Sequence, residues 1–343
     1  MIRFARRTVP AVALLACTGA FAAPDQLDVQ LTMANPVVQG DVDVAVDVAV
    51  TNTTGHAVKV LKWQLPSKHL QGPLFRIIKE DGTPASYVGP LVKRVAPRAE
   101  DYVQIEAGAT LNYRVELTGS YELGNGRHTV EYIARGRHGN EAVLASSSPL
   151  QLWTQGRSAP APVTESTDAL AASITYTGNC TSSEKTTLVS AVNAATTYAT
   201  QSNSYLAGTP SGTKRYVKWF GTFSSSRWNT VHTHFTNEEN AFKTKPLTLD
   251  CSCNDSGTYA YVYPNSPYKI YLCGAFWSAP MTGTDSKGGT LVHEMSHFTV
   301  VGGTDDWAYG QTAAANLAKS NPTKAVDNAD SHEYFAENNP YLP

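Results

Sequence analysis

Apolar and polar residues alternate along much of the chain between residues 24 and 153. In Asp41–Val50 the period is two, which is typical of a strand with one buried face. Similar runs, separated by turn residues, are Val58–Trp63, Leu74–Ile78 before a predicted hairpin turn at Glu80–Gly82, Tyr102–Ile105, Leu111–Leu117 and His128–Ala134. Many short strands with regular turns predict an antiparallel, immunoglobulin-like β-sandwich over residues 24–153. Four scattered histidines are predicted to be solvated on its surface: His56, His69, His128 and His138.

The pattern changes to helical spacing after residue 175. Apolar residues three and four apart predict helices over residues 183–206 and 228–243, whereas residues 216–223 fit a strand or a helix. Two β-rich runs, Tyr259–Tyr263 and Lys269–Cys273, predict a hairpin around the Pro264–Pro267 turn. Residues 175–343 therefore predict a second, mainly α domain of the α+β class.

Residues 154–174 join the two predicted domains and differ from both. This segment is rich in Pro, Ser, Thr and Ala, which is typical of an exposed linker. Exposed linkers are preferred sites of proteolysis, so we expect a maturation cut here and a mature chain that begins near Thr175.

The first 23 residues have the layout of a signal peptide. Three arginines precede a short apolar run, Val9–Ala16, and Ala20–Ala22 is an A-x-A cleavage site. The alternative is a lipoprotein signal at Leu14–Cys17. Secretion through the periplasm is the favoured prediction, because the better cleavage site comes after the cysteine.

Net charge and cysteine content indicate which partners and which covalent links to expect. The net charge is −2, so no basic field indicates a nucleic-acid partner, and no later run is apolar enough to anchor the mature form in a membrane. Cys17 leaves with the signal peptide, and the four remaining cysteines of an exported chain predict two disulfides. Spacing alone leaves the pairing open, and a structural zinc held by all four is the alternative: Cys180, Cys251, Cys253 and Cys273.

An H-E-x-x-H motif begins at His293. On a helix, His293 and His297 lie on one face and can direct two imidazoles at one metal ion, with Glu294 beside them to handle a proton. Gly302–Gly303 is predicted to end this helix. The chain can then fold back and deliver a third ligand from Thr304–Asp306, where both aspartates are candidates.

The motif continues as G-T-x-D-x-x-Y-G over Gly303–Gly310. The joint pattern resembles the aspzincin metalloendopeptidases, and from about residue 175 onwards it is most similar to the lysine-specific branch. The resemblance implies a zincin-like domain with one catalytic Zn²⁺ held by His293, His297 and Asp306. It further implies that Glu294 acts as the general base and that Tyr309 donates a hydrogen bond to the oxyanion, although Tyr309 could instead serve only in packing.

A second acidic pattern lies near the C-terminus. Asn321–Pro322 is a helix start, and Asp330, Glu333 and Glu337 follow at i, i+3 and i+7 on one face. By spacing alone, this pattern fits a solvated acidic face. The resemblance implies instead that Asp330 and Glu333 receive a substrate lysine at P1′, just after the scissile bond, and arginine is expected to be cleaved less well. The predicted hairpin over 259–273 is expected to lie beside the catalytic helix and to bind extended substrate at its edge.

The resemblance also implies how the remaining parts work. It pairs Cys180 with Cys251 and Cys253 with Cys273, and it makes residues 24–153 a propeptide, although a retained substrate-binding module is an alternative. No lysine lies between Lys93 and Lys185, so a lysine-specific enzyme could not cut its own linker. Either another protease matures the chain, or cleavage at Arg157 or another relaxed site is tolerated. A separate hypothesis is that the sandwich inhibits the enzyme intramolecularly by covering the cleft and offering a lysine to the acidic pocket.

Two classes of function follow from these patterns. The first is a secreted zinc endopeptidase that acts on proteins and peptides, of a kind that in some bacteria serves as a toxin. The second is a non-catalytic exported adhesin or binding protein with a structural zinc. The complete H-E-x-x-H motif with its glutamate favours the first class.

Overall fold

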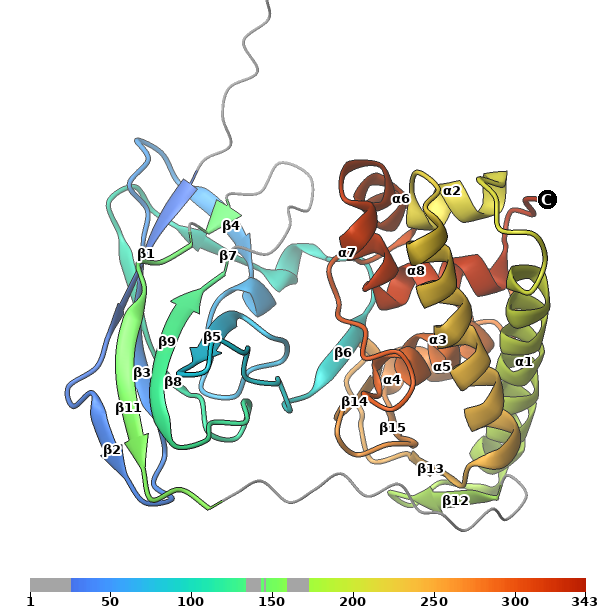
Figure 1. Cartoon of the computed structure of the whole chain (residues 1–343), viewed down its shortest axis with the longest axis horizontal. Helices are drawn as coiled ribbons and strands as arrows, with labels where there is room; N and C mark the ends of the chain where they lie inside the picture. The colour runs from blue at the N-terminus through green and yellow to red at the C-terminus, as the bar shows by residue number, and fades with distance from the viewer. Residues whose placement is uncertain (1–25, 134–142, 145, 159–172) are drawn as a thin grey trace, which may run out of the picture.

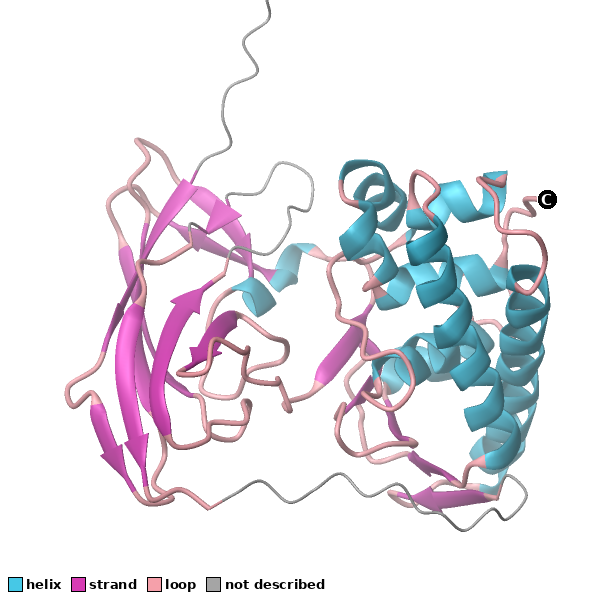
Figure 2. Ribbon diagram, in the orientation of Figure 1, coloured by secondary structure: helices cyan, strands magenta, loops and turns pink. Residues whose placement is uncertain are grey.

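A computed structural model describes residues 26–133, 143–144, 146–158 and 173–343. The predicted signal peptide, His138 and residues 159–172 of the predicted linker lie outside the described residues. A β-rich N-terminal half lies beside a helical C-terminal half (Figures 1 and 2). This division into a β-rich and a helical region confirms the coarse prediction from the hydrophobic pattern.

Two four-stranded sheets share one core in the N-terminal half. Their strand orders are β10-β1-β3-β8 and β2-β11-β9-β5. In β3, Val46, Val48 and Val50 are buried while the residues between them are partly exposed, as period-two alternation requires. The strands are β1 Gln26–Thr32, β2 Val37–Gln39, β3 Ala45–Thr51, β5 Phe75–Lys79, β8 Thr110–Glu116, β9 Gly126–Tyr132, β10 Val143–Leu144 and β11 Leu150–Gln155. A separate pair joins β4 (Val58–Leu61) and β7 (Tyr102–Ile105).

One strand of the N-terminal half belongs to the other half of the molecule. β6 (Leu91–Arg94) pairs antiparallel with β14 (Thr258–Val262), so the C-terminal sheet has the order β12-β13-β15-β14-β6. Figure 1 shows β6 between the two halves. The chain turns back at Glu80–Gly82, but the predicted hairpin is reduced to an isolated bridge between Ile78 and Pro84. The next strand, β6, pairs with β14 instead of with β5.

Helices cover the C-terminal sheet and form the second core. The hairpin prediction is confirmed, since β14 and β15 pair antiparallel, and the ambiguous segment near residue 216 is helical. The other strands are β12 Ile174–Thr177, β13 Leu247–Asp250 and β15 Lys269–Leu272. The helices are α1 Ser182–Leu206, α2 Lys214–Phe220, α3 Ser225–Thr244, α4 Gly274–Ser278, α5 Lys287–His297, α6 Gln311–Ser320, α7 Pro322–Val326 and α8 Ala329–Glu337, with short 3-10 turns η1 Lys62–Gln64 and η2 Ala99–Asp101. Among the described helices, none combines the length and apolar character that crossing a bilayer requires.

Both disulfides implied by the family resemblance are present. Cys180 is bonded to Cys251, and Cys253 is bonded to Cys273. The structural zinc site proposed for the four cysteines is therefore wrong, because every sulfur is already in a disulfide. The second bridge closes the loop that contains β14 and β15, beside the active-site helix.

Two local predictions were wrong and one was confirmed. α5 ends at His297 rather than at Gly302, and Gly303 serves the following turn with a φ of 61°. The helix start predicted at Asn321–Pro322 is confirmed, because α7 begins at Pro322 with Asn321 as its N-cap, and Asp330, Glu333 and Glu337 lie on the next helix, α8. His128 is only 1% exposed, because β9 turns it into the sandwich, where Nδ1 lies 3.1 Å from the Gly126 carbonyl oxygen.

Candidate active site

α5 carries the H-E-x-x-H residues and is buried along its whole length. Its start is fixed by Ser286, whose hydroxyl accepts a hydrogen bond from the Gly289 N–H at 2.9 Å. His293 and His297 lie one turn apart, and their Nε2 atoms are 3.2 Å from each other. His297 is oriented through its other nitrogen, since Nδ1 lies 2.7 Å from the backbone oxygen of Thr304.

The turn after α5 returns the chain to the two histidines. The Thr304 N–H donates to the Ser296 carbonyl at 3.2 Å, and the two side-chain hydroxyls lie 2.6 Å apart. This geometry brings Asp306 Oδ1 to 3.2 Å from His293 Nε2 and 3.5 Å from His297 Nε2. We call these three side chains the His–His–Asp group. Among the described residues, Asp306 and not Asp305 joins it.

The His–His–Asp group fits a divalent metal ion. Its members are each less than a tenth exposed, and one ligand atom from each lies within 4.8 Å of the others. Both oxygens of Asp306 are buried without a hydrogen-bond partner in the described part of the chain. Two imidazoles and a carboxylate are the donor set of a three-ligand catalytic zinc site. A cation would offset the cost of burying that carboxylate.

Glu294 lies next to this group and is fully buried. Neither of its oxygens has a hydrogen-bond partner among the described residues. Burial raises its pKa to about 8, although the neighbouring His293 opposes the shift. A carboxyl group beside the His–His–Asp group can exchange a proton with a molecule held there, which suits a general acid and base.

Tyr309 donates a hydrogen bond to a backbone carbonyl of the N-terminal half. Its hydroxyl is 3.1 Å from the oxygen of Val92, in β6. Burial raises the pKa of Tyr309 well above its ordinary value, so the hydroxyl keeps its proton and remains a donor. The Tyr309 side chain therefore does more than pack, because its hydroxyl also donates a hydrogen bond to the Val92 carbonyl.

The two predicted pocket residues, Asp330 and Glu333, are buried and hold a lysine. On α8 they are 1% and 0% exposed, so the alternative of a solvated acidic face is wrong. The Nζ of Lys93, from β6, lies 2.5 Å from Glu333 Oε2 and 3.5 Å from Asp330 Oδ1. Burial lowers the pKa of Lys93, but the charges of these carboxylates outweigh it and raise the pKa well above its ordinary value.

Three further residues, which no sequence pattern assigns to the lysine pocket, complete it. Asp285 Oδ1 is 3.9 Å from Lys93 Nζ and accepts a hydrogen bond from the Tyr334 hydroxyl at 2.6 Å. The Tyr259 and Tyr334 rings face the ammonium, with centroids 5.2 and 5.9 Å from Nζ. Asp285 precedes α5 and has a φ of 51°, and nothing in its sequence spacing connects it to α8.

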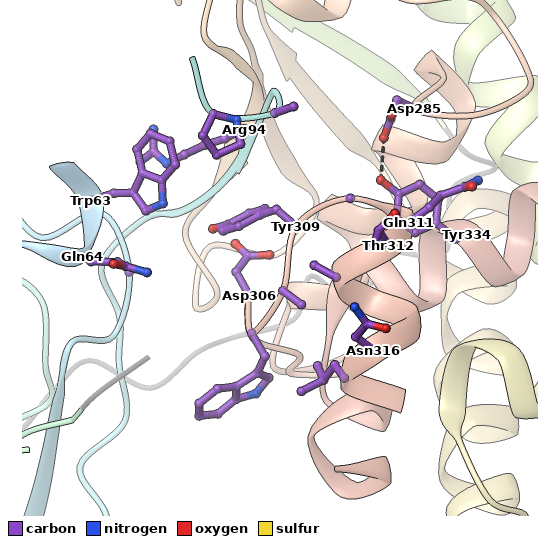
Figure 3. A pocket seen from close by; sticks show the side chains of 18 of the residues that line it. Trp63, Gln64, Arg94, Asp285, Asp306, Tyr309, Gln311, Thr312, Asn316 and Tyr334 are labelled. Atoms are coloured by element: carbon purple, nitrogen blue, oxygen red, sulfur yellow. Dashed lines mark hydrogen bonds between the residues drawn. The ribbon is translucent and has the colours of Figure 1, made fainter. Parts of the chain in front are cut away.

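Figure 3 shows the cavity that adjoins this site. It has a volume of about 780 Å³, and both halves of the chain line it. Trp63 and Arg94 of the N-terminal half face Asp306 and Tyr309 across it. The cleft is therefore bounded on one side by the β-rich half.

The other polar residues of α8 have partners elsewhere. Glu337 accepts hydrogen bonds from the Ser286 N–H and hydroxyl at 2.8 and 2.7 Å, at the start of α5. Nε2 of His332 lies 3.0 Å from Nδ1 of His234, whose ring stacks on it. His234 is therefore a structural residue rather than a ligand candidate.

The chain is similar in sequence to known proteases over most of its length. The chain is 43% identical to an extracellular protease of Aeromonas hydrophila over 328 residues, covering 92% of each chain. It is 40% identical to a peptidyl-Lys metalloendopeptidase of Grifola frondosa over 319 residues, covering 88% of this chain and 90% of the relative. A solved zinc peptidase from Grifola frondosa is 55% identical and superposes with a TM-score of 0.46, covering 48% of this chain and all of that one.

The family profile described as lysine-specific metallo-endopeptidase (aspzincin) matches residues 205–337, which include α5, the turn that follows it and α8. The full-length relatives extend the similarity over both halves of the molecule. The chain therefore belongs to the aspzincin family and is a metalloendopeptidase that hydrolyses peptide bonds with a zinc cofactor.

Proposed function

We propose that this chain is a secreted zinc endopeptidase that cleaves before lysine and is made as a proenzyme inhibited by its own N-terminal half. The observation that carries the proposal is Lys93, which lies in the acidic pocket while the carbonyl of the preceding residue faces Tyr309. Family membership decides against the non-catalytic adhesin.

His293, His297 and Asp306 would hold a single zinc ion and leave a fourth position for water. An ion held there would supply Lewis-acid chemistry, which lowers the pKa of a bound water and polarises the peptide carbonyl. Glu294 would take the water proton and pass it to the leaving amine. Tyr309 would donate to the carbonyl oxygen as negative charge develops there.

The lysine pocket supports a preference for lysine at P1′. The antiparallel register aligns Val92 with Tyr261 and Lys93 with Ala260, so a peptide bound to β14 in this way places one side chain in the pocket. A neutral side chain there would leave two buried carboxylates without a cation, which is costly. The relative from Grifola frondosa is named a peptidyl-Lys metalloendopeptidase, in agreement with this preference.

The N-terminal half would act as the inhibitor. β6 occupies the edge of β14, and Lys93 fills the pocket, so an extended substrate cannot bind at either place. We infer that residues 24–153 form an immunoglobulin-like propeptide, supported by two four-stranded sheets with one core. Residues 154–174 would be the linker and 175–343 the catalytic domain. The name of the Aeromonas relative supports secretion, and action as a toxin stays a prediction.

The proposal is tested by digesting a mixture of unfolded proteins with the matured form of the secreted full-length chain. Mass spectrometry of the fragments is expected to show lysine at the new N-termini, and a chelator is expected to abolish cleavage. Fragments without lysine at P1′ would contradict the specificity. Sequencing the mature N-terminus from the wild type and from Glu294→Gln distinguishes self-cleavage from cleavage by another protease.

A further inference from the structure

The ring of His293 belongs to two polar groups at once. Its Nε2 faces Asp306 and His297, whereas its Nδ1 lies 2.8 Å from Asp330 Oδ1 and 3.4 Å from Glu333 Oε2. The same Oδ1 of Asp330 is 3.5 Å from Lys93 Nζ. One carboxylate oxygen therefore lies next to both an imidazole of the His–His–Asp group and the cation in the lysine pocket.

The two imidazoles are oriented by different kinds of partner. Nδ1 of His297 faces the backbone carbonyl of Thr304, which carries no net charge. Nδ1 of His293 faces carboxylates that also bind a cation. Only the His293 side of the group can therefore respond directly to what the pocket contains.

Asp330 is better fixed than Glu333 for orienting a ring. Its second oxygen, Oδ2, accepts a hydrogen bond from the Gly310 N–H at 2.5 Å, and the side chain is 1% exposed. Glu333 uses Oε2 for Lys93, and its Oε1 has no hydrogen-bond partner among the described residues. The backbone of the loop after Asp306 thus holds Asp330 against His293, whereas Glu333 is directed chiefly at the lysine.

We propose that Asp330 is a positioning residue that links the lysine pocket to the metal site. It keeps the proton of His293 on Nδ1 and so turns the Nε2 lone pair towards the metal, and it contacts the ammonium of the P1′ lysine with the same oxygen. This inference rests on the proposed zinc endopeptidase function. Carboxylate partners of metal-bound histidines typically change metal affinity by about 10- to 100-fold.

The shared oxygen makes the two sites interdependent. An ammonium 3.5 Å from Asp330 Oδ1 competes with His293 for the negative charge of that oxygen. Filling the pocket with a cation therefore alters the electrostatic field at His293, and binding at either site changes binding at the other by the same factor. A substrate lysine bound in the pocket then also changes the electrostatic field at the catalytic centre.

The first test measures zinc affinity in the full-length chain, on a Glu294→Gln background that prevents processing. Asp330→Asn removes the negative charge 2.8 Å from His293 Nδ1 while keeping the shape of the side chain, so the zinc dissociation constant is expected to rise about 10- to 100-fold in competition with a chelator. Glu333→Gln is the matched control, since it removes the same charge 3.4 Å from the same ring nitrogen, and its rise is expected to be smaller.

Equal zinc affinity in Asp330→Asn and its background would overturn the inference, as would an equal loss in Glu333→Gln. Failure of the background chain to bind zinc would instead contradict the proposed function, so the two failures are distinguishable.

A second test does not depend on the folding of an α8 variant. Cobalt(II) replaces zinc in the full-length chain, and its visible absorption is compared between the same background and Lys93→Met. Methionine fills the pocket without a charge, so the absorption bands are expected to shift if the pocket and the metal site communicate through Asp330. Identical spectra would overturn the link.

Discussion

On its Nε2 side, the His293 ring lies next to His297 and Asp306. Among the described residues, no lysine or arginine forms an ion pair with the Asp306 carboxylate. On its Nδ1 side, Asp330 and Glu333 surround the ammonium of Lys93. Carboxylates are buried on both sides of the ring, but only on the Nδ1 side does a side chain of the protein, Lys93, supply the balancing positive charge. A buried carboxylate needs a cation, and here one side takes a metal ion while the other takes a side chain that a substrate can replace.

The Nε2 side carries the chemistry, so the largest effect is expected there. Glu294→Gln removes the carboxylate that exchanges the proton, and kcat is expected to fall by about 10²- to 10⁴-fold while zinc stays bound. Peptide hydrolysis and bound zinc are measured on the same sample. Substantial proteolysis by this variant would show that another group is the base.

Removing the cation from the Nδ1 side should destabilise the proenzyme. Lys93→Met leaves the buried carboxylates of Asp330 and Glu333 without the lysine ammonium that neutralises them, and breaking a buried ion pair in this way costs about 3–5 kcal/mol. Urea unfolding of the full-length chain on the Glu294→Gln background measures the loss. The control is Lys59→Met, on the exposed face of β4, where a change within about 0.5 kcal/mol is expected. Equal stability of the two variants would mean that Lys93 adds nothing to the docking of β6.

Sequence patterns predicted the Nε2 side almost completely and the Nδ1 side only in part. The spacing of His293, Glu294 and His297 on one helix is a local property, so the chain alone determines it. Asp285 reaches Lys93 only because α5 and α8 pack together, and Lys93 reaches the pocket only because β6 leaves its own half. Those contacts depend on long-range packing, which alternation along the sequence does not encode.

The same limit explains the errors elsewhere. His128 is predicted as a surface residue from its isolation in sequence, yet its place in β9 turns it inward. The Gly302–Gly303 pair suggested a helix end, but the backbone already leaves α5 at Phe298, because the Thr304 N–H bonds back to Ser296. Both outcomes follow from tertiary contacts that override local preference.

A smaller effect is expected for substrate selection. In Glu333→Gln the charge-assisted contact with a P1′ lysine is lost, which is worth about 1.5–3 kcal/mol. The kcat/KM of the matured enzyme for a lysine peptide is therefore expected to fall by about 10- to 150-fold, while that for a norleucine peptide changes little. A parallel fall for both peptides would indicate damage to the catalytic centre and not to selection.

The smallest effect is expected at the third acidic residue of α8. Glu337 is stabilised by N–H and hydroxyl donors at the start of α5 rather than by a cation. Glu337→Gln keeps one acceptor, so the free energy of unfolding is expected to fall by only about 1 kcal/mol, with lysine preference unchanged. A lost preference would show that Glu337 also shapes the pocket through Asp285.

The pairing of β6 with β14 has a consequence for the enzyme after maturation. Once β6 departs, β14 becomes the outermost strand of its sheet, with a row of unpaired backbone donors and acceptors that will accept any extended polypeptide. That polypeptide can be a substrate or an unfolded segment of a second enzyme molecule. A concentrated solution of mature enzyme is therefore prone to aggregation and to autolysis. The proenzyme is protected from both for as long as β6 stays paired with β14.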